Sequence, residues 1–274
     1  MSSTPDVWQR HSSQWQQIGP PLRPGPEDAR IMMEALAPAL AGANSRPVIG
    51  VLGVTPELVQ LPWQGTVDLR AFDQSAEMIA RVWTPNPNIA SEVQVARWQE
   101  LPAADQSLDA VIGDGSLYVL ESLDEYVSVL TQVHRVLRPG GLLALRCFVR
   151  PDRVETPQEI KRAVHAGEIG SFHALKLRLS MSLAGPPDYG IAVADVHALF
   201  EQVFDDRNAL AARTGWTRDT IDTIDAYSNS ATRYTCPTFP VLLDLLAPCF
   251  TDVVRRHGHY ELAGRCPTVA TRAK

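Results

Sequence analysis

The sequence predicts an α/β protein with a mostly parallel seven-stranded sheet, helices on both faces of the sheet, and a helical cap inserted between the fifth and sixth strands. Three observations predict this fold class. Short β-rich runs alternate with helical runs over residues 47–149, as in parallel sheets whose strands are joined by helices. Residues 150–248 are mostly helical in pattern and too numerous for a loop, which indicates an inserted cap. Strand character then returns in residues 249–274, which are expected to complete the sheet.

Seven β-rich segments account for the strands. They lie at residues 48–54, 67–72, 92–96, 109–113, 141–148, 252–255 and 268–271. The clearest connecting helix is predicted for residues 122–138, because Pro139 and two glycines follow it. Its apolar residues at helical spacing are expected to face the sheet: Val127, Leu130, Val133 and Leu137.

Residues 1–46 are predicted to form an N-terminal arm followed by a helix. Trp8 and Trp15 precede a proline-rich run at residues 19–26, and the helix is expected at about residues 27–40. Segments stiffened by proline usually lie over another part of the protein. The arm is therefore expected to cover a neighbouring surface.

The composition is that of a globular protein with a small-molecule partner. Of the 274 residues, 45% are hydrophobic and 20% are charged, which is typical of one elaborated globular domain. The formal charge of −6 argues against nucleic acid or an anionic membrane as a partner. The four cysteines lack metal-binding or redox spacing, and no signal peptide or membrane span is evident. We expect reduced thiols, no metal and a cytoplasmic location.

Residues that follow the predicted strands are the candidates for ligand binding, because open parallel sheets bind ligands beyond the carboxyl ends of their strands. Gly53 ends the first strand, and Thr55 and Pro56 suit the start of a helix whose amides would face an anionic group. Asp73 ends the second strand, 20 residues after Gly53, the separation at which a carboxylate reaches ribose hydroxyls. Asp68 is its rival, but it lies at the start of that strand.

The glycine pattern disfavours dinucleotides. Gly50 and Gly53 lack the third glycine that a pyrophosphate turn needs, which argues against NAD and FAD. The first lysine is Lys161, so a lysine-containing phosphate loop is also absent from the nucleotide-binding block. The residues therefore favour a nucleoside ligand without a pyrophosphate.

Four motifs resemble those of class I S-adenosylmethionine-dependent methyltransferases. They are VLGVTPE at residues 51–57, FDQSAEM at 72–78, LDAVIGDG at 108–115 and HRVLRPGG at 134–141. The last is the most specific, whereas the first contains fewer glycines than the family's usual first motif. The resemblance covers residues 47–149 and the C-terminal strands. It implies a Rossmann-like fold, with 47–149 as the cofactor-binding core, 150–248 as the substrate cap, and S-adenosylmethionine as the cofactor.

The resemblance implies a role for individual positions. The loop residues Gly50, Gly53, Val54 and Thr55 would lie beside the methionine and ribose of the cofactor, and Asp73 would bind the ribose hydroxyls. The adenine would lie against four residues: Gln74, Met78, Trp98 and Gln99. Trp98 has the alternative of a core residue. Asp114 and Ser116 would face the reaction centre, with helix capping as the alternative.

Arg23 is a further candidate, from the arm. Its stiff proline-rich surroundings suit a guanidinium that meets a carboxylate, such as that of the cofactor, and a solvated arginine is the alternative interpretation.

The implied reaction is in-line methyl transfer to a small molecule, driven mainly by alignment and desolvation. A general base is needed only if the accepting atom must lose a proton. The candidates are His173, Asp188, Tyr189 and His197, each of which is more often a surface or packing residue, and we expect His173 or Tyr189 to line the acceptor cavity. Two other functions stay open: a non-catalytic regulatory or assembly protein with the same fold, and an aminopropyl transferase.

Overall fold

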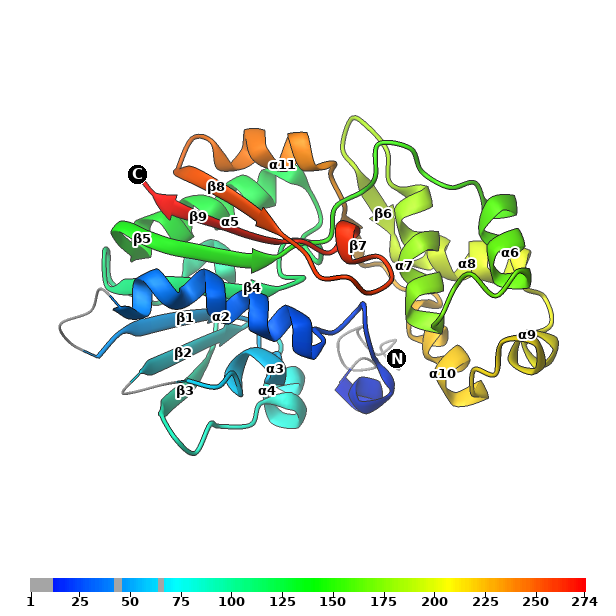
Figure 1. Cartoon of the computed structure of the whole chain (residues 1–274), viewed down its shortest axis with the longest axis horizontal. Coiled ribbons are helices and arrows are strands. Elements are labelled where there is room, and N and C mark those ends of the chain that lie inside the picture. Colours follow the sequence, from blue (N-terminus) through cyan, green and yellow to red (C-terminus); the bar gives the residue numbers. More distant parts are fainter. Residues whose placement is uncertain (1–11, 42–45, 64–66) are drawn as a thin grey trace, which may run out of the picture.

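Seven strands form one sheet in the order β3-β2-β1-β4-β5-β9-β8 (Figure 1). The computed structural model describes residues 12–41, 46–63 and 67–274. The strands are β1 (Val48–Leu52), β2 (Asp68–Asp73), β3 (Ala90–Val95), β4 (Leu108–Asp114), β5 (Leu137–Arg146), β8 (Phe250–Arg256) and β9 (Thr268–Ala273). The first five pair in parallel, and β9 runs antiparallel to both β5 and β8. The predicted mostly parallel sheet is confirmed.

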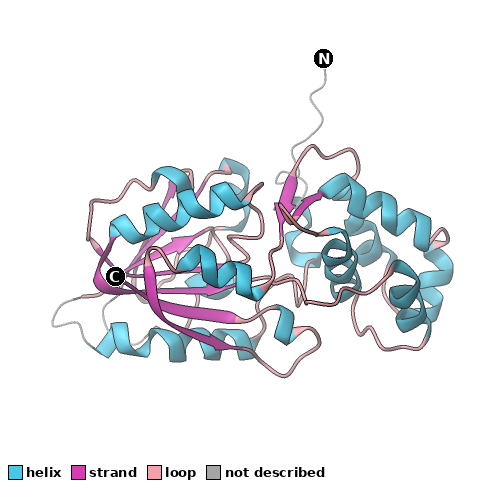
Figure 2. Cartoon of the chain, turned by 90° about the horizontal axis from the view of Figure 1, so that it is seen from above, coloured by secondary structure: helices cyan, strands magenta, loops and turns pink. Residues whose placement is uncertain are grey.

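Helices cover both faces of this sheet, as Figure 2 shows from above. On one face, α5 (Leu123–Val136) and α11 (Phe239–Leu246) bury Leu130 and Leu242. On the other face, α2 (Pro26–Ala41) and the short α3 (Pro56–Val59) bury Leu36 and Leu58, and both helices contact β4. A third helix, α4 (Ala76–Val82), packs against β2 and β3.

The predicted face of α5 needs a correction. Val127 is 49% exposed, whereas its neighbour Tyr126 is buried and donates its hydroxyl to the carbonyl of Thr235 at 2.8 Å. Leu137 lies outside the helix and begins β5, four residues earlier than the strand predicted at 141. The apolar spacing alone could not distinguish these positions, because tyrosine is apolar in body and finds its polar partner only in the folded chain.

Between β5 and β8 the chain forms a second layer of helices with its own core. The elements are α6 (Pro157–His165), α7 (Phe172–Leu183), β6 (Gly190–Ala192), α8 (Val193–Val203), α9 (Arg207–Thr214), α10 (Arg218–Asp222), the 3-10 helix η3 (Thr223–Tyr227) and β7 (Arg233–Thr235). Strands β6 and β7 pair antiparallel. Figure 1 shows these helices beyond the ends at which β4 and β5 finish. Helix α11, which precedes the expected boundary at 248, packs in the core of the sheet.

Local capping sets where the helices of this insertion begin. Thr156 and Glu159 form a capping box at the start of α6, and Ser171 caps α7. Asp206 caps α9, which ends at Gly215 in the left-handed conformation (φ 75°). These short polar signals explain why the insertion forms several short helices.

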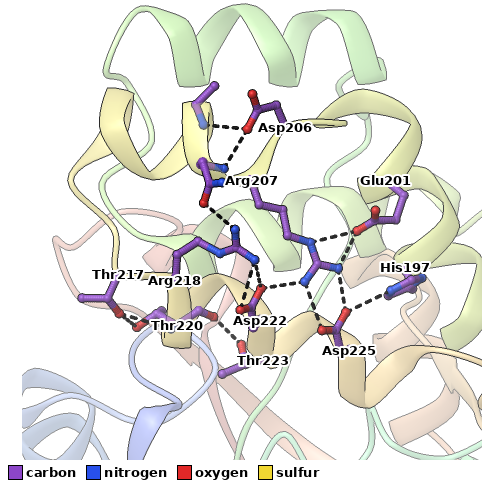
Figure 3. Close-up of polar contacts among 12 residues, drawn as sticks. His197, Glu201, Asp206, Arg207, Thr217, Arg218, Thr220, Asp222, Thr223 and Asp225 are labelled. Atoms are coloured by element: carbon purple, nitrogen blue, oxygen red, sulfur yellow. Dashed lines mark hydrogen bonds and ion pairs between the residues drawn. The ribbon is translucent and has the colours of Figure 1, made fainter.

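One arginine joins three elements of the insertion (Figure 3). Arg207 of α9 contacts Glu201 of α8 and Asp222 of α10, each at 2.6 Å, and also Asp225 of η3 at 2.6 Å. His197 of α8 lies 3.2 Å from the same Asp225. The network fixes the outer helices relative to one another. Within the described part of the chain, no helix is long and apolar enough to cross a membrane.

Candidate functional site

A cavity lies at the carboxyl ends of the parallel strands. Strand β1 has β2 on one side and β4 on the other, so the strand order reverses here, as it does at the ligand crevices of open α/β sheets. The cavity has a volume of about 330 Å³. Its lining residues are Asp73, Gln74, Ser75, Arg97, Trp98, Gln99, Val119, Leu120, Glu121, Glu125 and Thr232. Four predicted cofactor residues, Asp73, Gln74, Trp98 and Gln99, are brought together there.

Asp73 presents a partly buried carboxylate to this cavity. It is the last residue of β2, and its Oδ1 accepts a hydrogen bond from the Ser75 amide at 2.8 Å. Burial raises the pKa of Asp73 to about 6, although the hydrogen bond from Ser75 opposes the shift. An acceptor with unused lone pairs at a strand end suits a ligand that offers hydroxyl groups.

Trp98 and Gly53 are fixed against Asp73 by one shared carbonyl. The Phe72 oxygen accepts from the Trp98 indole Nε1 at 2.7 Å and from the Gly53 amide at 2.8 Å. Gly53 has a φ of +103°, and a Cβ there would lie 3.9 Å from both the Asp73 Oδ2 and the Trp98 ring. The three strand ends therefore form a continuous wall of backbone, carboxylate and indole. Trp98 is half-buried, and its indole Nε1 is hydrogen-bonded to the chain. It therefore packs against the protein on one side and lines the cavity on the other.

Gln99 belongs to a second part of the wall. Its Nε2 donates to Glu125 Oε1 at 3.1 Å, and Glu125 Oε2 accepts from the Glu121 amide at 2.8 Å. This chain of contacts joins the loop after β3 to the start of α5. The sequence reasoning did not single out either glutamate.

Three residues of the predicted cofactor loop and its neighbours are packed elsewhere. Gly50 lies within β1, where a Cβ would come within 2.9 Å of the Leu108 side chain, so this glycine serves packing between strands. Val54 and Met78 pack together in a small core and are 2% and 4% exposed. None of the three lines the cavity.

Two proposed capping roles are corrected by the structure. Thr55 occupies the N-cap position of α3, but its side chain makes no capping hydrogen bond and α3 is only four residues long. Ser116 donates its hydroxyl to the carbonyl of Leu52 at 2.9 Å, which ties the loop after β4 to the end of β1 and caps no helix. Both side chains are buried.

Asp114 is held by a partner that the sequence reasoning missed. Its Oδ1 lies 2.5 Å from Nε of Arg146, the last residue of β5, and the two side chains are 5% and 1% exposed. Burial raises the pKa of Asp114 to about 6, against the attraction of the Arg146 charge. Arg146 also donates to the Pro21 carbonyl at 2.9 and 3.0 Å. Asp114 thus anchors the arm through Arg146, and an arginine within an apolar strand was the signal for it.

Arg23 of the arm meets a carboxylate of the chain itself. Its Nη2 lies 2.5 Å from Glu57 Oε1, its Nη1 donates to the Trp15 carbonyl at 3.0 Å, and its guanidinium stacks 4.8 Å above the Trp15 ring. Four buried polar atoms of these segments have no hydrogen-bond partner within residues 12–41, 46–63 and 67–274: Arg23 Nε, Glu57 Oε2, Trp15 Nε1 and Gln14 Oε1. The set contains both donors and acceptors. Glu57 was absent from the predicted residues, and Trp8 lies outside the described ones.

The predicted catalytic candidates do not line the cavity. His173 of α7 bonds through Nε2 to the Gln17 carbonyl at 2.8 Å, and burial lowers its pKa to about 4. Tyr189 lies in the turn before β6 with a φ of 54°, next to an exposed Asp188. His197 belongs to the Arg207 network.

Comparison with known proteins finds a family match for part of the chain. A family model described as a methyltransferase domain matches residues 52–145, from the end of β1 through β5. A putative Zn-dependent alcohol dehydrogenase from Rhodobacter sphaeroides has a similar structure, with 12% identity, a TM-score of 0.61, and 98% of this chain and 97% of that chain covered. A SAM-dependent methyltransferase from Methanosarcina mazei is also similar, with 13% identity and a TM-score of 0.50. The match covers 92% of this chain and 99% of that chain. Among curated proteins, none matches the sequence. Residues 52–145 thus match a methyltransferase domain, within a chain whose fold is similar to that of a SAM-dependent methyltransferase.

Proposed function

We propose that the protein transfers the methyl group of S-adenosylmethionine to a small-molecule acceptor. The observation that carries the proposal is the junction of Gly53, Asp73 and Trp98 around one carbonyl, at the edge of a cavity of about 330 Å³. A cavity of this size suits a nucleoside-containing ligand, and it lies where open α/β sheets bind such ligands.

The nucleoside half of the cofactor fits this junction. The Asp73 carboxylate would accept hydrogen bonds from the two ribose hydroxyls, and the Trp98 ring and Gln74 would lie beside the adenine. Gly53 leaves space between Asp73 and Trp98 that a side chain would narrow. These three properties support a ribose and a base at the same place.

The amino-acid half fits the pair of Arg23 and Glu57. A methionine moiety carries one ammonium and one carboxylate, and the pair offers an unpartnered donor at Arg23 Nε and an unpartnered acceptor at Glu57 Oε2. The Trp15 indole Nε1 is a second buried donor without a partner among the described residues. This set supports a zwitterionic ligand and retains the predicted role of Arg23 beside a cofactor carboxylate.

The chemistry follows from positioning. When bound, the cofactor supplies a sulfonium-bound methyl group, a strong electrophile that needs no further activation. The chain's own residues bind the two polar halves, orient them, and exclude water through the arm, which Arg146, Ser171 and His173 hold in place. Alignment of this kind contributes roughly 7–11 kcal/mol to lowering a barrier.

Calorimetry and a labelled methyl group test the proposal. We expect the purified protein to bind S-adenosylmethionine and S-adenosylhomocysteine, and not NAD. With methyl-labelled cofactor and a cell extract, we expect label to appear in the dialysable fraction and not in protein or nucleic acid. Binding of NAD alone would refute the cofactor. Tight cofactor binding without any transfer of label would favour the non-catalytic alternative.

A further inference from the structure

A fully buried lysine lies in the second layer of helices, outside the cofactor cavity. Lys176 is in the middle of α7 and is 1% exposed. Among the described residues its Nζ has no hydrogen-bond partner, and it lies 4.8 Å from the centre of the Tyr227 ring. Burial lowers the pKa of Lys176 to about 7. An ammonium group has three donors and no acceptor, so burying it without an anion is unfavourable.

His173 adds a second unsatisfied atom on the same face of α7. It precedes Lys176 by three residues, a spacing that places two side chains next to each other on a helix. Because its Nε2 meets a carbonyl oxygen, that nitrogen carries the proton and Nδ1 is an acceptor. Nδ1 is buried and has no hydrogen-bond partner in the part of the chain that the structure describes. The donor Lys176 Nζ and the acceptor His173 Nδ1 are therefore both buried on one face of α7 without a hydrogen bond to either from the described residues.

Further aromatic rings continue from the Tyr227 ring through the core of these helices. The Tyr118 ring lies 4.9 Å from that of Tyr234 and 5.1 Å from that of Phe148, and Tyr227 lies 6.2 Å from Tyr234. Tyr118 is hydrogen-bonded with Ser180, one turn after Lys176 on α7. Flat rings of this kind offer faces and edges to another flat ring.

The aromatic residues Tyr118 and Tyr234 are close in sequence to residues that line the cofactor cavity. Tyr118 directly precedes Val119 and Leu120, which line the cavity, and Tyr234 follows Thr232, which also lines it. The Thr235 amide donates to the Tyr118 carbonyl at 3.0 Å, so these two segments are joined. The arm covers the other side, because Gln17 and Pro20 accept hydrogen bonds from His173 and Ser171 at 2.8 and 3.2 Å.

We propose that Lys176 binds the negative charge of the methyl acceptor, and that the acceptor is a small aromatic carboxylic acid. The carboxylate meets the Lys176 Nζ, and the ring of the acid packs against Tyr118 and Tyr227. This inference rests on the proposed function, because it places the acceptor beside the cofactor cavity. Entry of the acid separates the two contacts between the arm and α7.

The chain's three lysines allow a direct test. Besides Lys176 it contains only Lys161, exposed on α6, and the C-terminal Lys274. Protein with ¹³C at lysine Cε and saturated with S-adenosylhomocysteine is titrated with benzoate, and separately with its neutral analogue benzamide. We expect benzoate to shift the Lys176 signal and to raise its titration midpoint by about one pH unit, because a nearby anion favours the charged amine. Benzamide should leave both unchanged.

Two lysine variants complete the test. Lys176→Met keeps the length of the side chain and removes an unpaired amine, so it should fold and bind S-adenosylhomocysteine as the original protein does. We expect it to weaken benzoate binding about tenfold by calorimetry, the effect of one lost charge-assisted hydrogen bond. Lys161→Met, the exposed control, should leave benzoate affinity unchanged.

The outcomes separate this inference from the proposed function. Failure of S-adenosylhomocysteine to bind contradicts the proposed function itself. With that ligand bound, the inference is overturned by equal shifts with benzoate and benzamide, by no response to benzoate, or by full benzoate affinity in Lys176→Met. The titration of the original protein decides the question even if that variant does not fold.

Discussion

Asp73 combines two opposing demands at the residue scale. Burial raises its pKa to about 6, whereas the Ser75 amide and the expected ribose hydroxyls favour the ionised form. The folded protein therefore keeps a carboxylate that is less favourable than the same group in water, and ligand hydroxyls can stabilise it. Asp68, at the other end of β2, instead lies 3.8 Å from Arg70 and is half-buried.

The first prediction compares these two acids. Asp73→Asn should weaken binding of S-adenosylhomocysteine by about 1.5–3 kcal/mol, the range for lost hydrogen bonds to a charged group. Asp68→Asn should leave the affinity nearly unchanged, because Asp68 lies at the opposite end of β2. Isothermal titration calorimetry measures both, and the reverse order would contradict the placement of the ribose.

The second prediction concerns pH. The folded pKa of Asp73, about 6, lies above the ordinary value of 3.8 for an aspartate, so the folded state binds the proton more tightly than the unfolded state. The stabilisation of the folded state by this tighter proton binding is fully present below about pH 4, and it is lost as the pH rises through about 6. Asp73→Asn should therefore be more stable than the original protein at pH 8, by on the order of 2–3 kcal/mol. Chemical denaturation at pH 8 and pH 4 checks this, and an equal difference at both pH values would be inconsistent with it.

At the scale of elements, the outer helices of the insertion depend on Arg207. This side chain contacts Glu201, Asp222 and Asp225, and the Asp225 hydrogen bond raises the pKa of the guanidinium above its usual value. A single ion pair with an exposed partner contributes little to stability. One arginine that contacts three elements, however, couples those elements to one another. Arg218 is a suitable comparison, because it is more exposed and its contacts are with Asp222 and Asn208.

The third prediction follows from this coupling. Arg207→Met should increase hydrogen exchange in α8, α9 and η3 by an amount equivalent to about 1–2 kcal/mol, while the sheet keeps its protection. Arg218→Met should change exchange much less. Exchange measured by mass spectrometry distinguishes the two, and equal effects of both variants would show that the network is not centred on Arg207.

At the scale of the whole molecule, the arm joins the sheet to the insertion. It contacts Arg146 at the end of β5, Glu57 after β1, and His173 on α7. A segment held at three places can exclude water from the ligand without belonging to either layer. This arrangement agrees with the prediction that the arm covers a neighbouring surface.

The fourth prediction tests the arm's role in cofactor retention. Arg23→Met should raise the dissociation rate of S-adenosylmethionine about tenfold, because one charge-assisted contact and the stacking on Trp15 are lost. Arg30→Met, an exposed arginine of α2 paired with Glu34, is the control and should leave the rate unchanged. Stopped-flow measurement of dissociation decides between them. Unchanged kinetics in a well-folded Arg23→Met protein would limit the arm to packing.

The sequence by itself determined the elements and the parts of the site that follow strand ends. Alternating β-rich and helical runs depend on neighbouring residues, so the strands and α5 were predictable within a few residues. Asp73 and Trp98 were predictable as neighbours because parallel strands bring their carboxyl ends to one edge.

Only the tertiary structure decided which distant charges meet. Asp114 is paired with Arg146, and Arg23 with Glu57, across 32 and 34 positions of the chain. Such pairs leave no periodic signal, since each depends on where two separate segments pack. The same reason applies to Lys176: its position on a helix was readable, but its burial without an anion follows only from the helices and rings folded around it.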